Sequence, residues 1–222
     1  MTPLRLLSSL IVTLLPFISC NGADPAFKVE IDCSAAPECE AFATKAKTIV
    51  EEWYPKINEI LFSKDHPLTT AVVRLKFEPM KGVAHATNDG IHISAEWVTK
   101  KAPNDYGMVV HELTHIVQDY KGKGEGWLTE GIADYIRHQY FEKDGDKLKQ
   151  HINPDKSSYK QAYTTAAAFL VWLEEHKDKE LVHKLNAESH DGTYKTELFK
   201  QYCGADVDAL WKEFTDSLRP KA

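Results

Sequence analysis

The stretch His111-Glu112-Leu113-Thr114-His115 says more about fold and chemistry than any other part of this chain. It lies in residues 106–120, where apolar side chains recur at helical spacing and predict one amphipathic helix. Asn104 or Asp105 is expected to cap its start and Gly122 to end it. Residues four apart in a helix are separated by about 40° around its axis, so both imidazoles can reach one metal ion.

Glu112 follows the first histidine, where its carboxylate can hold and deprotonate a metal-bound water. This is the H-E-x-x-H arrangement of zinc hydrolases. Residues 127–143 predict a second helix with Glu130 and Asp134 on one face. A catalytic zinc takes three protein ligands and keeps one position open. We therefore predict one Zn²⁺ on the two histidines and Glu130, with Asp134 accepting a hydrogen bond from a ligand imidazole. The alternative for both carboxylates is a solvated acidic face.

The block Trp127–Tyr135 after this motif resembles the gluzincin pattern, in which the Glu of an Asn/Thr-Glu-Gly-x-Ala block is the third zinc ligand. The wider chain resembles the basic secretory protein family, the peptidase of plants and bacteria. The matching stretches are residues 88–95, 109–118, 126–137, 163–172 and 210–214.

The resemblance implies a zincin-type metallopeptidase domain over residues 27–218, acting on peptides or proteins. It implies zinc on His111, His115 and Glu130, with Glu112 as the catalytic carboxylate. The plant relatives are basic, whereas this chain has a formal net charge of -6. A charge-driven partner is therefore not carried over, and the lack of a Lys/Arg cluster argues against nucleic acid.

The expected mechanism has Glu112 take a proton from the attacking water and pass it to the leaving amine. A second electrophile is expected for the oxyanion, and Tyr163 is the candidate because its helix falls in a family-like block; a buried structural tyrosine is the alternative. Gly131 costs its helix about 1 kcal/mol relative to alanine, which a close approach to the metal-binding helix would explain.

The fold class predicted is α+β and zincin-like: a small N-terminal sheet, an active-site helix and a mostly helical C-terminal part. Residues 71–78 alternate as a half-buried strand, and residues 83–87 and 91–95 flank a hairpin turn. By the resemblance, residues 91–95 are the edge strand on which an extended peptide docks, with an ordinary core strand as the alternative. Residues 40–61 form a helical stripe that Pro55 should kink or split.

The first 20 residues read as an export signal, with Arg5 before an apolar stretch. Residues 17–20 resemble a bacterial lipobox, which favours lipidation of Cys20 over ordinary cleavage near Ala23. The protein is thus expected to be secreted, periplasmic or a membrane-anchored lipoprotein, touching a membrane only through that anchor. An exported protein can keep disulfides, and Cys33 and Cys39 are close enough to pair, unless Cys203 pairs with one of them instead.

Two other functions fit the same residues. One is a zincin-shaped binding protein that holds zinc without catalysis, although a pure metal site has no use for Glu112. The other is a zinc amidase that acts on cell-wall peptides, which the metal ligands alone do not distinguish from a peptidase.

Overall fold

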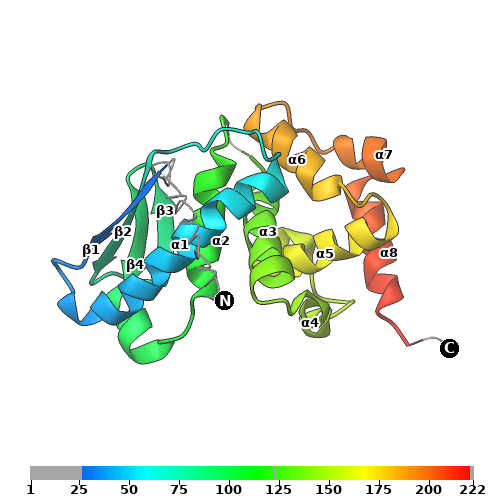
Figure 1. Ribbon diagram of the computed structural model, residues 1–222. Coiled ribbons are helices and arrows are strands. Elements are labelled where there is room, and N and C mark those ends of the chain that lie inside the picture. The colour runs from blue at the N-terminus through cyan, green and yellow to red at the C-terminus, as the bar shows by residue number, and fades with distance from the viewer. Residues whose placement is uncertain (1–26, 123, 221–222) are drawn as a thin grey trace, which may run out of the picture.

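The computed structural model describes residues 27–122 and 124–220, so the leader and Cys20 lie outside the described residues. Four strands form one sheet, and helices make up most of the remainder (Figure 1). The predicted α+β class is confirmed. The strands are β1 (Lys28–Asp32), β2 (Val72–Glu78), β3 (Ala84–Thr87) and β4 (Gly90–Ser94).

The sheet has the strand order β1-β2-β4-β3, with β3 antiparallel to β4 and the other pairs parallel. In β2 the side chains of Val73, Leu75 and Phe77 are fully buried, and the residues between them face outward, as the alternation predicted. The hairpin also forms as predicted. The edge strand on the hairpin side is β3, however, and β4 lies inside the sheet between β2 and β3. The prediction of residues 91–95 as the edge was wrong, because β4 pairs on both sides while the turn folds β3 back along its outer flank.

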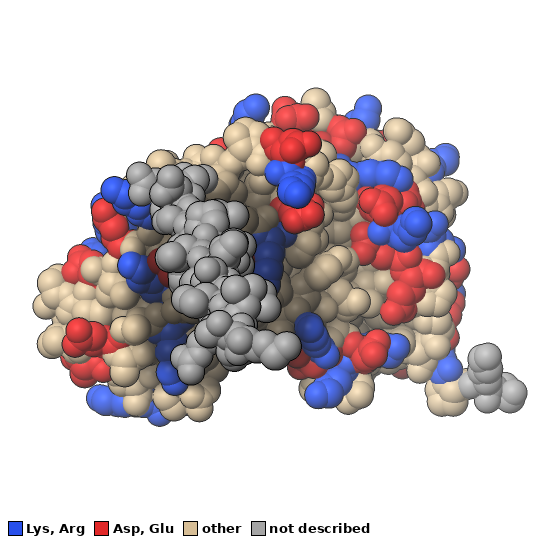
Figure 2. All heavy atoms as spheres, in the orientation of Figure 1, with Lys and Arg blue, Asp and Glu red and all other residues tan. Residues whose placement is uncertain are grey.

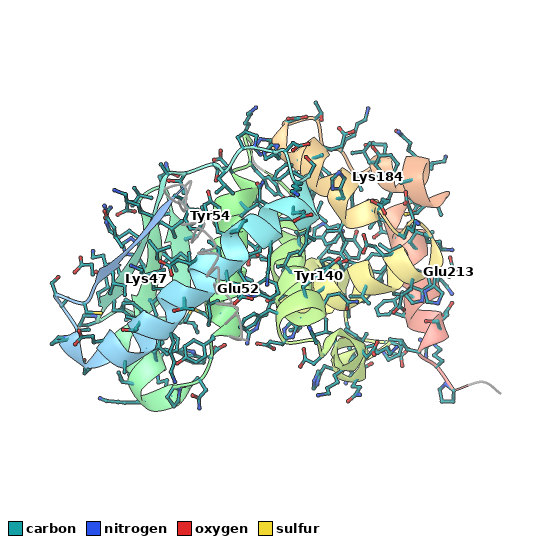
Figure 3. All side chains as sticks on the ribbon, viewed as in Figure 1. Lys47, Glu52, Tyr54, Tyr140, Lys184 and Glu213 are labelled. Atoms are coloured by element: carbon teal, nitrogen blue, oxygen red, sulfur yellow. The ribbon has the colours of Figure 1, made fainter. Side chains whose placement is uncertain are left out.

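Helix α1 (Glu40–Leu61) follows the short 3-10 turn η1 (Pro37–Cys39) and runs unbroken through Pro55. A proline removes one backbone hydrogen bond and frees the carbonyl four residues earlier. Both Pro55 and Glu51 are exposed, so water can satisfy that carbonyl and the helix does not split. Charged residues such as Lys47 and Glu52 lie along the outside of α1 (Figure 3), whereas Tyr54 is fully buried.

Helix α2 (Gly107–Gln118) carries the H-E-x-x-H residues and follows the π-helix η2 (Trp97–Lys101). The N-cap position is Tyr106, one residue later than predicted, and Asp105 accepts a hydrogen bond from the backbone N–H of Met108 in the first turn at 3.2 Å. The helix ends four residues before Gly122, because Asp119 takes the left-handed conformation with φ of 35°.

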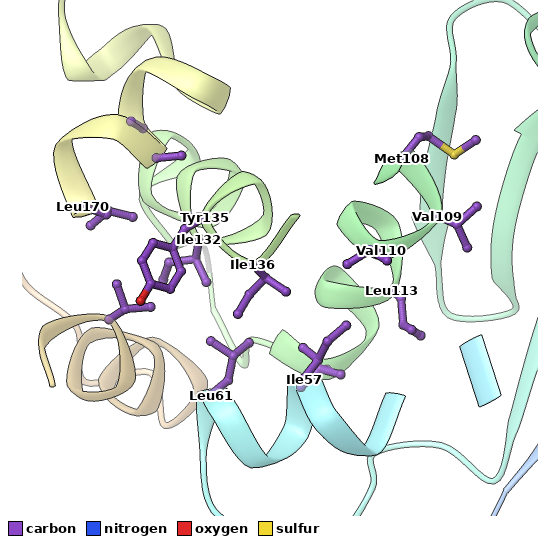
Figure 4. Packing of buried hydrophobic residues seen from close by; sticks show 14 of the residues in the cluster. Ile57, Leu61, Met108, Val109, Val110, Leu113, Ile132, Tyr135, Ile136 and Leu170 are labelled. Carbon is purple, nitrogen blue, oxygen red and sulfur yellow. The ribbon is translucent and has the colours of Figure 1, made fainter. Parts of the chain in front are cut away.

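The C-terminal part is a bundle of short helices to one side of the sheet (Figure 1). Its elements are α3 (Gly126–Tyr135), the π-helix η3 (Ile136–Phe141), α4 (Gly145–Leu148), η4 (Lys149–His151), η5 (Tyr159–Gln161), α5 (Tyr163–His176), α6 (Leu181–His190), α7 (Leu198–Cys203) and α8 (Val207–Ser217). One apolar core joins the two halves, where Leu113 of α2 and Ile136 after α3 pack near Ile57 of α1 (Figure 4).

The predicted Cys33–Cys39 disulfide is not formed, and Cys33, Cys39 and Cys203 are free thiols. Cys39 is buried in the apolar core at the start of α1, while Cys33 stays partly exposed at its margin. Burial raises the pKa of the Cys39 thiol to about 11, which disfavours the reactive thiolate. Among the described residues, no helix is long and apolar enough to span a membrane.

Candidate active site

The side chains of His111 and His115 from α2 and of Glu130 from α3 converge on one point. We call these three potential metal-donor residues the donor cluster. The Nε2 atoms of His111 and His115 are 3.2 Å apart, and Oε2 of Glu130 lies 3.2 Å from the first and 3.4 Å from the second. Ligands of a tetrahedral zinc at about 2.0–2.1 Å are about 3.3 Å from one another. The triangle of donor atoms therefore fits a single tetrahedral ion and leaves a fourth position open.

Each histidine is oriented through its other ring nitrogen. His111 donates from Nδ1 to Oδ1 of Asp134 at 2.7 Å, which leaves its Nε2 free to face the other two donors. His115 donates in the same way to the side-chain oxygen of Gln118 at 2.7 Å. The Gln118 amide in turn donates to the backbone oxygen of Thr129 at 3.0 Å, which ties the end of α2 to the start of α3.

Two opposing effects set the charges of this cluster. Burial disfavours the imidazolium of His111, but hydrogen bonds to Asp134 and Glu130 outweigh it and raise its pKa to about 9. Burial also disfavours the Glu130 carboxylate, yet both histidines together lower its pKa to about 2. The carboxylates of Asp134 and Glu130 thus favour a positive charge beside the histidines. A divalent cation would supply that charge when it displaces a proton from the imidazoles.

Glu112 lies in the wall of a cleft with a volume of about 700 Å³. The three donor residues, the edge strand β3 and Tyr163 line the same cleft. Burial raises the pKa of the Glu112 carboxyl, while the nearby His111 and His115, and to a lesser extent the backbone N–H of Ala86 in β3, act in the opposite direction. The carboxylate expected to act on water is thus placed between the donor cluster and the edge of the sheet.

Tyr163 is exposed rather than part of a buried stripe, with 53% of its surface accessible, so a buried structural tyrosine is wrong. The reason lies in the backbone, because Ala162 and Tyr163 both take positive φ, 62° and 49°, where α5 begins. This conformation is unfavourable for non-glycine residues. It leaves the tyrosine ring 6.1 Å from that of His111 and nearly parallel to it. The charge of Glu130 raises the pKa of the phenol, so the hydroxyl stays protonated and can donate.

A polar network at one end of the cleft was not predicted from the sequence. Asp105 accepts from the indole of Trp97 at 3.0 Å and from the guanidinium of Arg137 at 2.9 Å, and Arg137 also donates to Glu142 at 2.8 Å. Arg137 lies seven residues after Glu130, two helical turns along the same face, and that spacing is the signal that could have pointed to it. Gln118, three residues after His115, could have been found in the same way.

Gly131 packs against α5, not against the metal-binding helix as the sequence suggested. A Cβ at this position would lie 2.7 Å from the Cβ of Ala166. The close approach that a glycine permits is therefore between α3 and α5, immediately beside Glu130.

A second group, His138, Glu142 and Asp144, also has donor atoms near one another. His138 donates from Nδ1 to Asp144 at 2.8 Å and lies 3.2 Å from Glu142, while Arg137 binds the other oxygen of Glu142. The carboxylates are thus already engaged by the Arg137 guanidinium and by the His138 imidazole, whose pKa they raise, and the group is a hydrogen-bonded polar network.

Residues 26–214 match the sequence profile of a family described as peptidase of plants and bacteria. The chain belongs to this peptidase family. This confirms the resemblance that residues 88–137 and 163–172 carry. No curated protein matches the sequence at a significant level.

Among solved structures, an M1 zinc metallopeptidase from Deinococcus radiodurans is similar over 76% of this chain and 44% of its own, with 14% identity and a TM-score of 0.51. A two-domain M1 zinc metallopeptidase bound to L-tryptophan is similar over the same shares, with 13% identity and a TM-score of 0.50. The chain spans less than half the length of these structures. At this identity the likeness shows a shared fold.

Proposed function

We propose that this peptidase is zinc-dependent and holds one Zn²⁺ on His111, His115 and Glu130. The observation that carries the proposal is the near-equilateral triangle of two imidazole nitrogens and one carboxylate oxygen, with sides of 3.2 to 3.4 Å. Two imidazoles and a carboxylate suit zinc better than the oxygen-seeking magnesium or calcium. The hydrogen bonds to Asp134 and Gln118 support it, since ligand histidines commonly have such a partner.

Zinc bound at this position would lower the pKa of a coordinated water and polarise the carbonyl group of the scissile bond. Glu112 follows His111 on α2 and lines the same cleft, so its carboxylate can accept the proton of the attacking water. The same carboxyl then returns that proton to the leaving amine, which splits off as a neutral group. Asp134 keeps the Nδ1 proton of His111 in place throughout.

The exposed hydroxyl of Tyr163 is the candidate donor to the oxyanion. Its ring overlies His111 at the mouth of the cleft, and no protein atom accepts from its hydroxyl among the described residues. A donor aimed at the developing charge contributes most where water is excluded.

The free edge of β3 offers the substrate a backbone partner. The backbone N–H of Ser94 donates to the oxygen of Val83, so in this register His85 and Thr87 also bond to β4. Alternate residues of an antiparallel strand point the other way. Ala84 and Ala86 therefore direct their N–H and C=O groups toward the cleft that they line. The Ala86 N–H faces the Glu112 carboxylate there, so the Ala84 groups and the Ala86 carbonyl are the ones to which an extended peptide can add as a further strand.

The test is mass-spectrometric profiling of a mixed peptide library with the zinc-loaded protein and with Glu112→Gln as the matched control. Cleavage by the wild type alone, with equal zinc content in both proteins, is the expected result. If neither protein cleaves any peptide while both hold zinc, a binding role or an amidase acting on cell-wall peptides becomes the better proposal. If neither protein holds zinc, the metal assignment is wrong.

We further infer export from the leader in residues 1–20, with lipidation at Cys20. Intact-mass measurement of the protein purified from membranes and from the soluble fraction tests this. A lipid adduct on an N-terminal Cys20 is expected, whereas an unmodified chain that starts near Asp24 would exclude lipidation.

A further inference from the structure

A second cavity continues the cleft on the other side of the donor cluster. It has a volume of about 430 Å³ and is lined by Thr69 and Thr70, by the β3–β4 turn and by the end of α2. Both cavities share Ala86 and His115 in their walls. The groove therefore runs along β3 past the donor cluster in both directions.

The direction of a bound peptide follows from the strand it would join. Antiparallel pairing is the more stable arrangement per residue. A peptide antiparallel to β3 has its amino-terminal residues near Thr87, over the second cavity, and its carboxy-terminal residues near Val83, over the first. The scissile bond then lies between the two cavities, at the donor cluster.

Within the part of the chain that the structure describes, the second cavity places no carboxylate near that cluster to hold a free amino terminus. An ammonium group requires a carboxylate beside it when it leaves water. The one carboxylate among the described lining residues is Asp119, which is exposed and lies four residues beyond His115, about 6 Å further along the axis of α2. Threonines, a valine, an isoleucine and backbone groups make up most of the remaining wall.

Among the described residues, the first cavity has no arginine or lysine free to bind a terminal carboxylate. Arg137 is the one arginine or lysine among its described lining residues. Its guanidinium already binds Asp105 at 2.9 Å and Glu142 at 2.8 Å, so two carboxylates compensate its charge. A peptide carboxylate placed there would meet a site that is negative overall.

We propose that this enzyme is an endopeptidase, which binds an extended peptide on both sides of the scissile bond and does not recognise a chain end. The proposal rests on the peptidase function proposed above and specifies its substrate class. Contacts of the substrate peptide on both sides of the scissile bond, rather than recognition of a charged chain end, supply the binding energy.

Two peptides of one sequence test the proposal, one with free termini and one acetylated and amidated. About eight residues suffice, since they extend over about 26 Å as a strand. We expect the zinc-loaded protein to cut both at the same internal bond with similar kcat/KM. Release of single residues from the free peptide alone would overturn the proposal and leave the peptidase function intact. Failure to cut either peptide or any member of the mixed library would remove the peptidase function and this inference with it.

A variant in which the second cavity is filled provides a second test of the proposal. In Thr70→Trp an indole would fill the second cavity, and we expect kcat/KM for the eight-residue blocked peptide to fall by about tenfold or more because strand contacts are lost. A blocked substrate with one residue before the scissile bond should lose much less. Thr48→Trp is the matched control, since Thr48 is exposed on α1 and lines neither cavity. Equal kcat/KM for the long peptide in Thr70→Trp and Thr48→Trp, with equal thermal stability, would overturn the proposal.

Discussion

Gly131→Ala tests how tightly the third ligand is placed. The substitution adds one methyl group where α3 meets α5, and its Cβ would lie 2.7 Å from the Cβ of Ala166. Ordinary contacts between such atoms begin at 3.4 Å. Ala166 is fully buried and its Cβ is fixed to the backbone of α5, so it cannot rotate away. The two helices must therefore separate by about 0.7 Å in a close-packed interior.

Two opposing terms decide the stability of the metal-free protein. Alanine in place of glycine stabilises a helix interior by about 1 kcal/mol, while overpacking costs about 1–3 kcal/mol. We expect a net loss of about 0–2 kcal/mol in the free energy of unfolding. Zinc binding should suffer more, because Glu130 is the adjacent residue and metal–ligand distances tolerate only about 0.2 Å. A loss in zinc affinity of about 10- to 100-fold is expected, comparable with the loss of a hydrogen-bond partner to a ligand.

Competition titration with a chelating dye measures the zinc affinity, and urea unfolding of the chelated protein measures the stability. The matched control is the pair Gly131→Ala/Ala166→Gly, in which the methyl group is moved from α5 to α3. The pair should recover most of the zinc affinity. If Gly131→Ala alone is about 1 kcal/mol more stable than wild type and binds zinc equally well, then helix propensity decides this position and the argument from close approach is refuted.

Four further predictions concern the same site and its surroundings. Asp134→Asn should bind zinc about 10- to 100-fold more weakly in the same titration, since its carboxylate orients His111; an unchanged affinity would contradict this. Tyr163→Phe should lower kcat by about 10²- to 10³-fold in peptide assays with zinc affinity unchanged, whereas an unchanged kcat would remove the tyrosine from the mechanism. Zinc at about 1,000 times its Kd should stabilise the protein by about 4 kcal/mol. In differential scanning fluorimetry this corresponds to a Tm about 8–16 °C higher than with chelator; coincident melting curves would show that zinc does not bind preferentially to the folded protein. For His138, burial opposes protonation, but hydrogen bonds to Glu142 and Asp144 outweigh it and raise the pKa above its ordinary value of 6.5. The charged form thus stabilises the fold fully below that value and the contribution is lost as pH rises through the folded pKa. His138→Gln should accordingly be destabilising in urea at pH 6 and much less so at pH 9, and a deficit that does not depend on pH would show that packing alone is at stake.

The parts of the site that the sequence predicts are those set by local spacing. His111 and His115 share a helix face because they are four residues apart, and Glu130 and Asp134 share another for the same reason. The hairpin of β3 and β4 is equally local, since its turn residues determine it.

The parts that the sequence does not predict depend on pairing between distant segments. Which hairpin strand becomes the edge depends on β2 bonding to β4, and these strands are separate in the chain. The exposure of Tyr163 depends on a positive φ at Ala162, a position where the sequence has no glycine to indicate it. The hydrogen bond between Arg137 and Asp105 joins residues that are 32 apart in the chain, and no periodic sequence pattern predicts it.

The donor cluster is divided between the two halves of the molecule. Helix α2 lies beside the sheet and supplies both histidines, while α3 belongs to the helical part and supplies Glu130 (Figure 1). Among the described residues, the polar links between these helices near the site are His111 to Asp134, both histidines to Glu130, and Gln118 to Thr129. A metal ion on His111, His115 and Glu130 would join the two helices directly, so metal binding and the geometry of the cleft are coupled. Basic and acidic side chains are interspersed on the face seen in Figure 2 rather than gathered by sign.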